Sequence, residues 1–136
     1  MSPPQVLGVA SSPRRGGNSE TMLDAALEGA RSAGAKVRKV ALAELGFSPC
    51  RNCGGCSRTG RCVLGDALVE LNDRIEAADR LVLATPIFFG SMCAQMKALV
   101  DRGQPFWVRK YVLGQAPALP EPAAGHQQRP AGELPR

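Results

Sequence analysis

Four of the five cysteines in this 136-residue chain fall within thirteen positions, separated by gaps of two, two and five residues. The four are Cys50, Cys53, Cys56 and Cys62. Two-residue gaps let successive thiolates approach one small centre, and the glycines at 54, 55 and 60 supply the backbone freedom that such wrapping needs. The run therefore indicates a metal centre or a redox group carried on a single loop.

The alternatives for this cysteine run are a disulfide web, a zinc ion, an iron–sulfur cluster and a loop without metal. Nothing near Met1 resembles a signal peptide, so we expect a cytoplasmic chain with reduced thiols, which argues against disulfides. The spacing differs from the bacterial ferredoxin pattern, whose last gap is three and is followed by proline; here the gap is five and Val63 follows. Zinc sites made of four cysteines also use two-residue gaps, but usually on two knuckles with a longer spacer.

A second group of polar residues lies in the segment 11–21, which reads Ser-Ser-Pro-Arg-Arg-Gly-Gly-Asn-Ser-Glu-Thr. It has neither the Gly-Lys-Ser/Thr ending of a P-loop nor the dinucleotide pattern G-x-G-x-x-G. The segment suits a phosphate monoester, because it offers hydroxyl groups, Arg14, Asn18 and the free N–H groups at the start of a helix. The alternative is an ordinary polar turn in which Asn18 or Ser19 caps the helix.

The elements that must position these groups alternate between strand and helix. We predict strands at 6–10, 36–42 and 81–84, and helices from 18 to about 34, at 66–79, and from 91 to about 103. The apolar run 81–84 is typical of a strand buried on both faces. In the third helix, Met92, Met96 and Leu99 follow one stripe, and Cys93 is expected to be a small buried apolar residue.

This alternation predicts an α/β domain with parallel strands in the order 2-1-3, joined by right-handed crossovers. Ligands of such sheets bind outside the carboxyl ends of the strands, where the strand order reverses. The loops 11–19 and 85–91 follow the first and third predicted strands, so we expect them to meet at that edge.

The composition argues against nucleic acids and membranes as partners. The net charge of +5 comes from scattered arginines without a basic helix face, and only 4% of the residues are aromatic. No apolar run approaches the roughly 20 residues that span a bilayer.

Three segments together resemble the NAD(P)H-dependent FMN reductases of flavodoxin-like fold, and in particular the iron–sulfur flavoproteins. They are the segment 11–21, the cysteine run, and Thr85-Pro86-Ile87-Phe88-Phe89-Gly90-Ser91 leading to Gln95-Met96-Lys97-Ala98-Leu99-Val100-Asp101-Arg102. The resemblance covers about residues 6–102. It implies an FMN-dependent oxidoreductase that moves electrons between NAD(P)H or a ferredoxin-type donor, FMN and a [4Fe–4S] cluster.

The resemblance also implies site residues. It assigns the FMN phosphate to Ser12, Arg14, Asn18 and Ser19. It assigns the isoalloxazine ring to Pro86, Ile87, Phe88, Phe89, Gly90 and Ser91, and the cluster to Cys50, Cys53, Cys56 and Cys62. The chain has Ser19 where the family often has Thr, and Phe88 where it often has Tyr. Because neighbouring side chains on an extended segment point to opposite sides, one of Phe88 and Phe89 is expected in the core. No catalytic acid or base is assigned.

Two other functions stay open: a cluster-free NAD(P)H-dependent FMN or quinone reductase, and a non-catalytic protein whose four-cysteine loop binds zinc or a partner. A flavodoxin-like sheet has five strands and only three are recognisable here. We therefore expect an incomplete domain over residues 1–114 and a disordered tail over 115–136, which is rich in Pro, Ala, Gly and Gln. The third strand would then be an apolar edge, so we expect a homo-oligomer.

Overall fold

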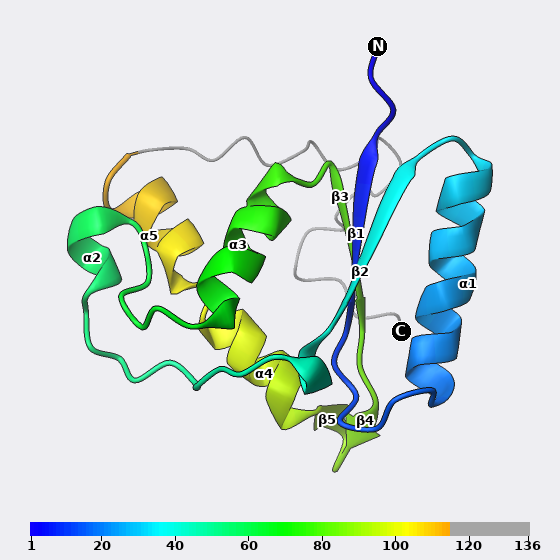
Figure 1. Cartoon of the computed structure of the whole chain (residues 1–136). Coiled ribbons are helices and arrows are strands. Elements are labelled where there is room, and N and C mark those ends of the chain that lie inside the picture. The colour runs from blue at the N-terminus through cyan, green and yellow to red at the C-terminus, as the bar shows by residue number, and fades with distance from the viewer. Residues whose placement is uncertain (115–136) are drawn as a thin grey trace, which may run out of the picture.

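The computed structural model describes residues 1–114 and contains a three-stranded parallel sheet with helices on both faces (Figure 1). The strands are β1 (Gln5–Ala10), β2 (Lys36–Ala41) and β3 (Arg80–Ala84), in the order β2-β1-β3. In the register of this sheet, Val9 of β1 lies between Val40 and Leu83. The predicted α/β class and the predicted order 2-1-3 are confirmed.

Alternate side chains of β1 pack into two separate cores, one on each face of the sheet, as the two-residue period of a strand requires. Val6 and Ala10 pack with Leu23 and Leu27 of helix α1 (Asn18–Ser32) on one face. Gly8 lies on that face too, and a Cβ atom there would meet a Leu27 methyl carbon at 2.6 Å. Glycine at this position therefore lets α1 approach the sheet closely.

The opposite face carries the larger core, which helices α3 (Ala67–Ala77) and α4 (Ala94–Asp101) cover. Leu7 and Val9 of β1 face it. The other buried members are Leu42, Leu68, Leu71, Cys93, Met96 and Leu99. Helix α3 begins where predicted, because the Asp66 carboxylate caps it by accepting the Leu68 N–H at 3.2 Å.

The prediction that the third helix begins at Ser91 is wrong. Residues Ile87–Phe88 (β4) and Ser91–Met92 (β5) form a two-stranded antiparallel hairpin, and α4 begins only at Ala94. Phe89 and Gly90 both have positive φ, 50° and 77°, which is the backbone of a tight hairpin turn. Cys93 is consequently the N-cap of α4 and does not lie on its apolar stripe, although it is buried as expected.

Strand β3 also differs from the prediction of a strand buried on both faces. Leu81 and Leu83 are 41% and 45% exposed, because in residues 1–114 this strand pairs with β1 alone. The expected apolar sheet edge is thus present within the described part of the chain.

Five short elements were not predicted: the hairpin strands β4 and β5, the 3-10 turn η1 (Leu42–Glu44), α2 (Cys56–Thr59) inside the cysteine loop, and α5 (Gln104–Tyr111). Helix α5 begins with a proline in its first turn, a position that suits proline because no N–H is needed there. Among residues 1–114, no helix has the length and apolar character needed to cross a bilayer. The predicted disordered tail lies outside the described residues.

Candidate functional site

The two loops predicted to bind FMN lie side by side at the carboxyl ends of β1 and β3. Ser11 donates both its backbone N–H and its hydroxyl to the Ala84 carbonyl, each at 2.9 Å. The Cys93 thiol lies 3.3 Å from both the carbonyl oxygen and the hydroxyl oxygen of Ser11. The Cys93 N–H donates to the Thr85 hydroxyl at 3.2 Å. This buried polar group therefore joins the end of β1, the end of β3 and the start of α4.

The hydrogen bonds around Cys93 also affect its acidity. Burial acts to raise the pKa of the Cys93 thiol, but hydrogen bonds with Ser11, with Thr85 and with the backbone of Met96 and Gln95 together leave that pKa below its ordinary value. Sequence reasoning missed this role, because a cysteine among apolar residues indicates simple packing.

The start of helix α1 has no side-chain cap. Its N-cap is Gly17, so the alternative in which Asn18 or Ser19 caps the helix is wrong. The first N–H groups of a helix have no acceptor inside it, and without a cap they stay available to an anion. The Ser12 hydroxyl accepts the Arg14 N–H at 3.2 Å and thereby shapes the loop that precedes the helix.

The charges of this loop are divided between a paired and an unpaired arginine. Glu20 is buried and binds Arg15 and Lys39, each at 2.8 Å, and it also accepts the Gly16 N–H at 2.7 Å. The hydrogen bond from Arg15 is the largest reason why the pKa of Glu20 lies far below its usual range. Within residues 1–114 the Arg14 guanidinium makes no ion pair, and it lies over Gly17. Arg14 is therefore the cation of this loop that can neutralise a bound anion.

The residues assigned to the flavin ring form the exposed β4–β5 hairpin and its approach. Pro86 is partly buried, whereas Ile87, Gly90 and Ser91 are exposed. Both phenylalanines are exposed as well, Phe88 at 48% and Phe89 fully, so the prediction that one of them packs in the core is wrong. The reason is that the two-residue strands belong to no larger sheet and Phe89 occupies the turn. The result is an apolar surface next to the loop 11–19.

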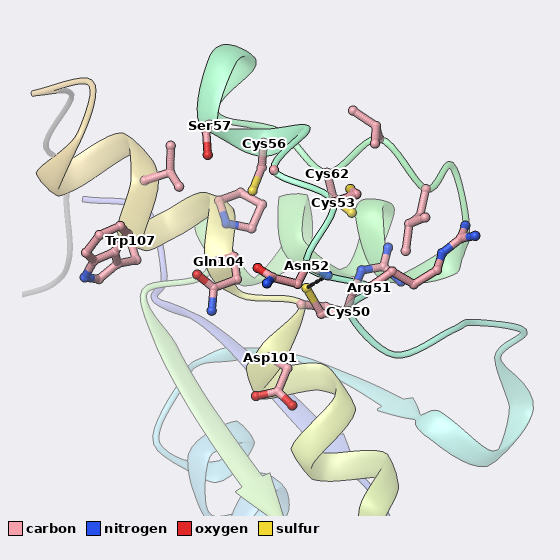
Figure 2. A pocket seen from close by; sticks show the side chains of 16 residues that line it. Cys50, Arg51, Asn52, Cys53, Cys56, Ser57, Cys62, Asp101, Gln104 and Trp107 are labelled. Atoms are coloured by element: carbon pink, nitrogen blue, oxygen red, sulfur yellow. Dashed lines mark hydrogen bonds between the residues drawn. The ribbon is translucent and has the colours of Figure 1, made fainter.

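The four clustered cysteines line one cavity of about 360 Å³, between their loop and the junction of α4 with α5 (Figure 2). All are free thiols; Cys50 and Cys53 are exposed, and Cys56 and Cys62 are partly buried. Figure 2 shows the cysteines on the loop side, with Gln104 and Trp107 across the cavity.

The backbone of the cysteine loop turns sharply at positions with positive φ. They are Asn52, Gly54 and Gly60, at 52°, 71° and 69°. Gly60 ends α2, and a Cβ atom there would lie 2.6 Å from a side-chain carbon of Arg109, so glycine lets the loop contact α5. The prediction that glycines supply backbone freedom to this loop is confirmed for Gly54 and Gly60 and is wrong for Gly55, which has a helical φ of −57°.

The sulfur atoms are close enough to influence one another without converging on one point. Burial is the main cause of the raised pKa of Cys56, and the other three cysteines add to it by electrostatic repulsion. Within residues 1–114, no three Cys, His, Asp or Glu side chains are arranged as metal ligands. The loop would thus have to rearrange before a metal could bind.

The chemistry of the donor set fits a thiolate-bound centre. Soft thiolate ligands select zinc or iron–sulfur clusters.

Helix α4 joins the two candidate sites. Its N-cap, Cys93, contacts the loop after β1, and the residue after its last turn, Arg102, borders the cysteine cavity. Eight residues of α-helix span about 12 Å. The two candidate sites are therefore neighbours within one small domain.

Comparison with known proteins gives consistent matches. The chain is 34% identical to an iron-sulfur flavoprotein of Archaeoglobus fulgidus, over 92% of this chain and 61% of that protein. It is 37% identical to an iron-sulfur flavoprotein of Methanosarcina thermophila, over 72% of this chain and 51% of that protein. A NAD(P)H dehydrogenase (quinone) of Aromatoleum aromaticum is 32% identical over 69% of this chain and 45% of that protein. The chain thus spans about half the length of these relatives.

The solved structure of a flavone reductase has the same fold, with a TM-score of 0.60 and 24% identity over 83% of this chain and 38% of that one. The family described as NADPH-dependent FMN reductase matches residues 4–127, which is most of the chain. The chain therefore belongs to the NADPH-dependent FMN reductase family, with the flavodoxin-like arrangement of its parallel sheet.

Proposed function

We propose that this chain is the FMN- and cluster-binding part of a cytoplasmic electron-transfer oxidoreductase. Electrons from NAD(P)H or a ferredoxin-type donor would pass between FMN and a [4Fe–4S] cluster held by the cysteine loop. The observation that carries the proposal is the position of α4, whose two ends border the two candidate sites. Electron transfer slows steeply with distance, so a separation of one short helix favours transfer within the domain.

The proposed FMN site combines the two loops at the end of the sheet. Ser12, Arg14, Asn18 and Ser19 would bind the phosphate, with the uncapped start of α1 and the unpaired Arg14 supplying donors. Pro86, Ile87, Phe88, Phe89, Gly90 and Ser91 would line the isoalloxazine ring. Bound FMN supplies the one- and two-electron chemistry, and the protein supplies position and electrostatics.

The proposed cluster ligands are Cys50, Cys53, Cys56 and Cys62. Their support is the common cavity, the all-thiol donor set and the similarity to proteins named iron-sulfur flavoproteins. A cluster adds a second one-electron carrier beside the flavin, which lets a two-electron donor serve a one-electron acceptor.

The test is chemical analysis of the full chain purified without oxygen. Flavin released by heat, iron and acid-labile sulfide are each measured per chain, together with the visible absorption spectrum. The proposal expects one FMN, four iron and four sulfide per chain, as the composition of one [4Fe–4S] cube requires. Flavin without iron would indicate a cluster-free FMN or quinone reductase. Zinc without sulfide or flavin would leave a protein with a structural cysteine site.

A further inference from the structure

The two ends of the cysteine loop are held together by one buried arginine. Arg102 donates to the Ser48 carbonyl at 2.7 Å, two residues before the first cysteine. It also binds both carboxylate oxygens of Asp66, at 2.6 and 2.7 Å, four residues after the last cysteine. The Ser48 N–H completes the group by donating to Asp66 at 3.0 Å. The loop from 48 to 66 is therefore closed at its base without any metal.

One nitrogen atom of the Arg102 guanidinium has no partner. Its side chain is 1% exposed, and its Nε atom is buried without a hydrogen-bond partner among residues 1–114. Arg102 and Cys62 both line the cysteine cavity. The hydrogen bond with Asp66 is the main cause of the raised pKa of Arg102. A buried N–H group without an acceptor is costly, so this position requires an acceptor in the working protein.

Stability alone does not explain the buried ion pair. Charges taken out of water lose hydration, and apolar residues of similar volume are often equally stabilising or better. The Arg102 backbone is fixed independently, because its carbonyl accepts the Asn72 side-chain N–H at 2.9 Å. The guanidinium is thus a rigid cation held at the edge of a thiol cavity.

We propose that Arg102 is a positioning residue of the cysteine centre, which clamps the loop and directs its Nε–H to the Cys62 sulfur atom. This inference rests on the proposed function. Hydrogen bonds and positive charge near ligand sulfurs favour the reduced cluster, because each added electron brings negative charge. Reduction of the cluster would form or break no bond between protein and cluster, and the electron would come from the flavin.

The experiment compares Arg102→Gln and Arg102→Lys with the control Arg61→Gln. Arg61 is a suitable control because it is a second arginine near Cys62, which it directly precedes in the sequence. It pairs with Asp73 at the surface, where solvent and salt screen its charge. The cluster midpoint potential is measured by anaerobic titration followed by electron paramagnetic resonance, together with iron and sulfide per chain. We expect Arg102→Gln to shift the potential to more negative values and to lower the iron content. Arg102→Lys keeps the positive charge but not the clamp, so its potential should shift less than that of Arg102→Gln. Arg61→Gln should have the potential and the iron content of the parent.

A second measurement does not need the cluster. Hydrogen–deuterium exchange of residues 48–66 in the metal-free chain should be faster in Arg102→Lys than in the parent and in Arg61→Gln. If the parent binds no iron and sulfide, the proposed function fails, and this exchange measurement still decides whether Arg102 clamps the loop. Equal exchange, equal iron content and equal potential in all three variants would overturn the inference. If Arg102→Gln does not fold, Arg102→Lys decides.

Discussion

The Cys93 thiol lies 3.3 Å from the Ser11 hydroxyl oxygen, although the two residues are 82 positions apart in the sequence. Ser11 directly follows β1 and Cys93 is the N-cap of α4, so this contact joins the end of the first strand to the helix that borders both candidate sites. The neighbouring Thr85 hydroxyl lies 3.5 Å from the same thiol.

Replacement of Cys93 by valine keeps most of the buried volume and removes the thiol contacts. We expect Cys93→Val to lower the free energy of unfolding by about 1 kcal/mol, the typical net value of a buried hydrogen bond. Cys93→Ser keeps a small donor and should cost less. Urea denaturation measures both changes, and a valine variant as stable as the parent would show that the thiol contacts contribute nothing.

The five cysteines should separate into two classes in single Cys→Ser variants. The expectation is loss of most iron and sulfide when Cys50, Cys53, Cys56 or Cys62 is replaced. Cys93→Ser should retain both, because Cys93 lies at the other end of α4 from the cysteine cavity. Iron and acid-labile sulfide per chain, in preparations made without oxygen, provide the readout. Equal metal in all five variants would show that the cysteine run is not the ligand set.

Binding of the FMN phosphate should depend on Arg14 and Asn18. The double variant Arg14→Ala/Asn18→Ala removes a charged donor from the uncapped start of α1, so FMN affinity should fall at least about tenfold. Riboflavin has no phosphate, and its affinity should change little. Arg31→Ala, at the far end of α1, is the matched control. Fluorescence titration with both ligands measures the two affinities. An equal loss of affinity for FMN and riboflavin would show that this loop does not bind the phosphate.

Acid should weaken the fold through Asp66. The hydrogen bond from Arg102 is the main reason why the pKa of Asp66 is lowered from 3.8 to about 2. A lowered folded-state pKa means that the stabilisation is complete above pH 4 to 5 and is lost as the pH falls toward 2. The shift corresponds to about 2 kcal/mol.

The measurement is urea unfolding of the metal-free chain at several pH values between 7 and 2. Asp66→Asn should be less stable than the parent at pH 7, and the difference should shrink as the pH approaches 2. Asp101→Asn, which breaks an exposed pair with Lys97, is the control and should change stability little. A constant difference between Asp66→Asn and the parent across this range would contradict the titration.

The free edge of β3 should cause self-association of this chain. Leu81 and Leu83 are about half exposed on a strand with one unpaired edge in the described residues, and such edges pair readily with other chains. We expect a dimer or larger species at micromolar concentration by light scattering. Leu81→Lys/Leu83→Lys should shift the chain toward monomer, whereas Met22→Lys, at an exposed position on α1, should not. A monomeric parent would contradict this expectation.

The parallel sheet could be predicted because its signals are local. The apolar run 6–10, the periodic stripe of α1 and the cap at Asp66 each indicate their element within a few residues. The predicted start of α4 was wrong for a physical reason. Met92, Met96 and Leu99 follow helical spacing by coincidence, whereas the turn at Phe89 and Gly90 places Met92 in the hairpin. Periodicity does not detect a residue that adopts positive φ.

The role of Arg102 could not be predicted from the sequence. An arginine after the last turn of a helix is usually exposed, where it interacts with the free carbonyl groups of the helix end. Its partners Ser48 and Asp66 lie 54 and 36 positions away, so only the packing of α3 against α4 reveals the buried pair. The four cysteines, by contrast, lie on one loop and line one cavity, as residues so close in sequence can; that they bind one metal centre stays a prediction.

The clamp at the base of the cysteine loop has a consequence for biosynthesis. A ribosome adds roughly 5 to 20 residues per second, and forty residues separate Cys62 from Arg102. For about 2 to 8 seconds after the last loop cysteine is made, the chain therefore lacks the arginine that closes the loop. The clamp can form only after Arg102 has been added, so the four cysteines are made before the residue that closes their loop. If the loop holds the proposed cluster, loss of its iron would thus leave the clamp at the base of the loop in place, because Arg102, Ser48 and Asp66 bind one another without metal.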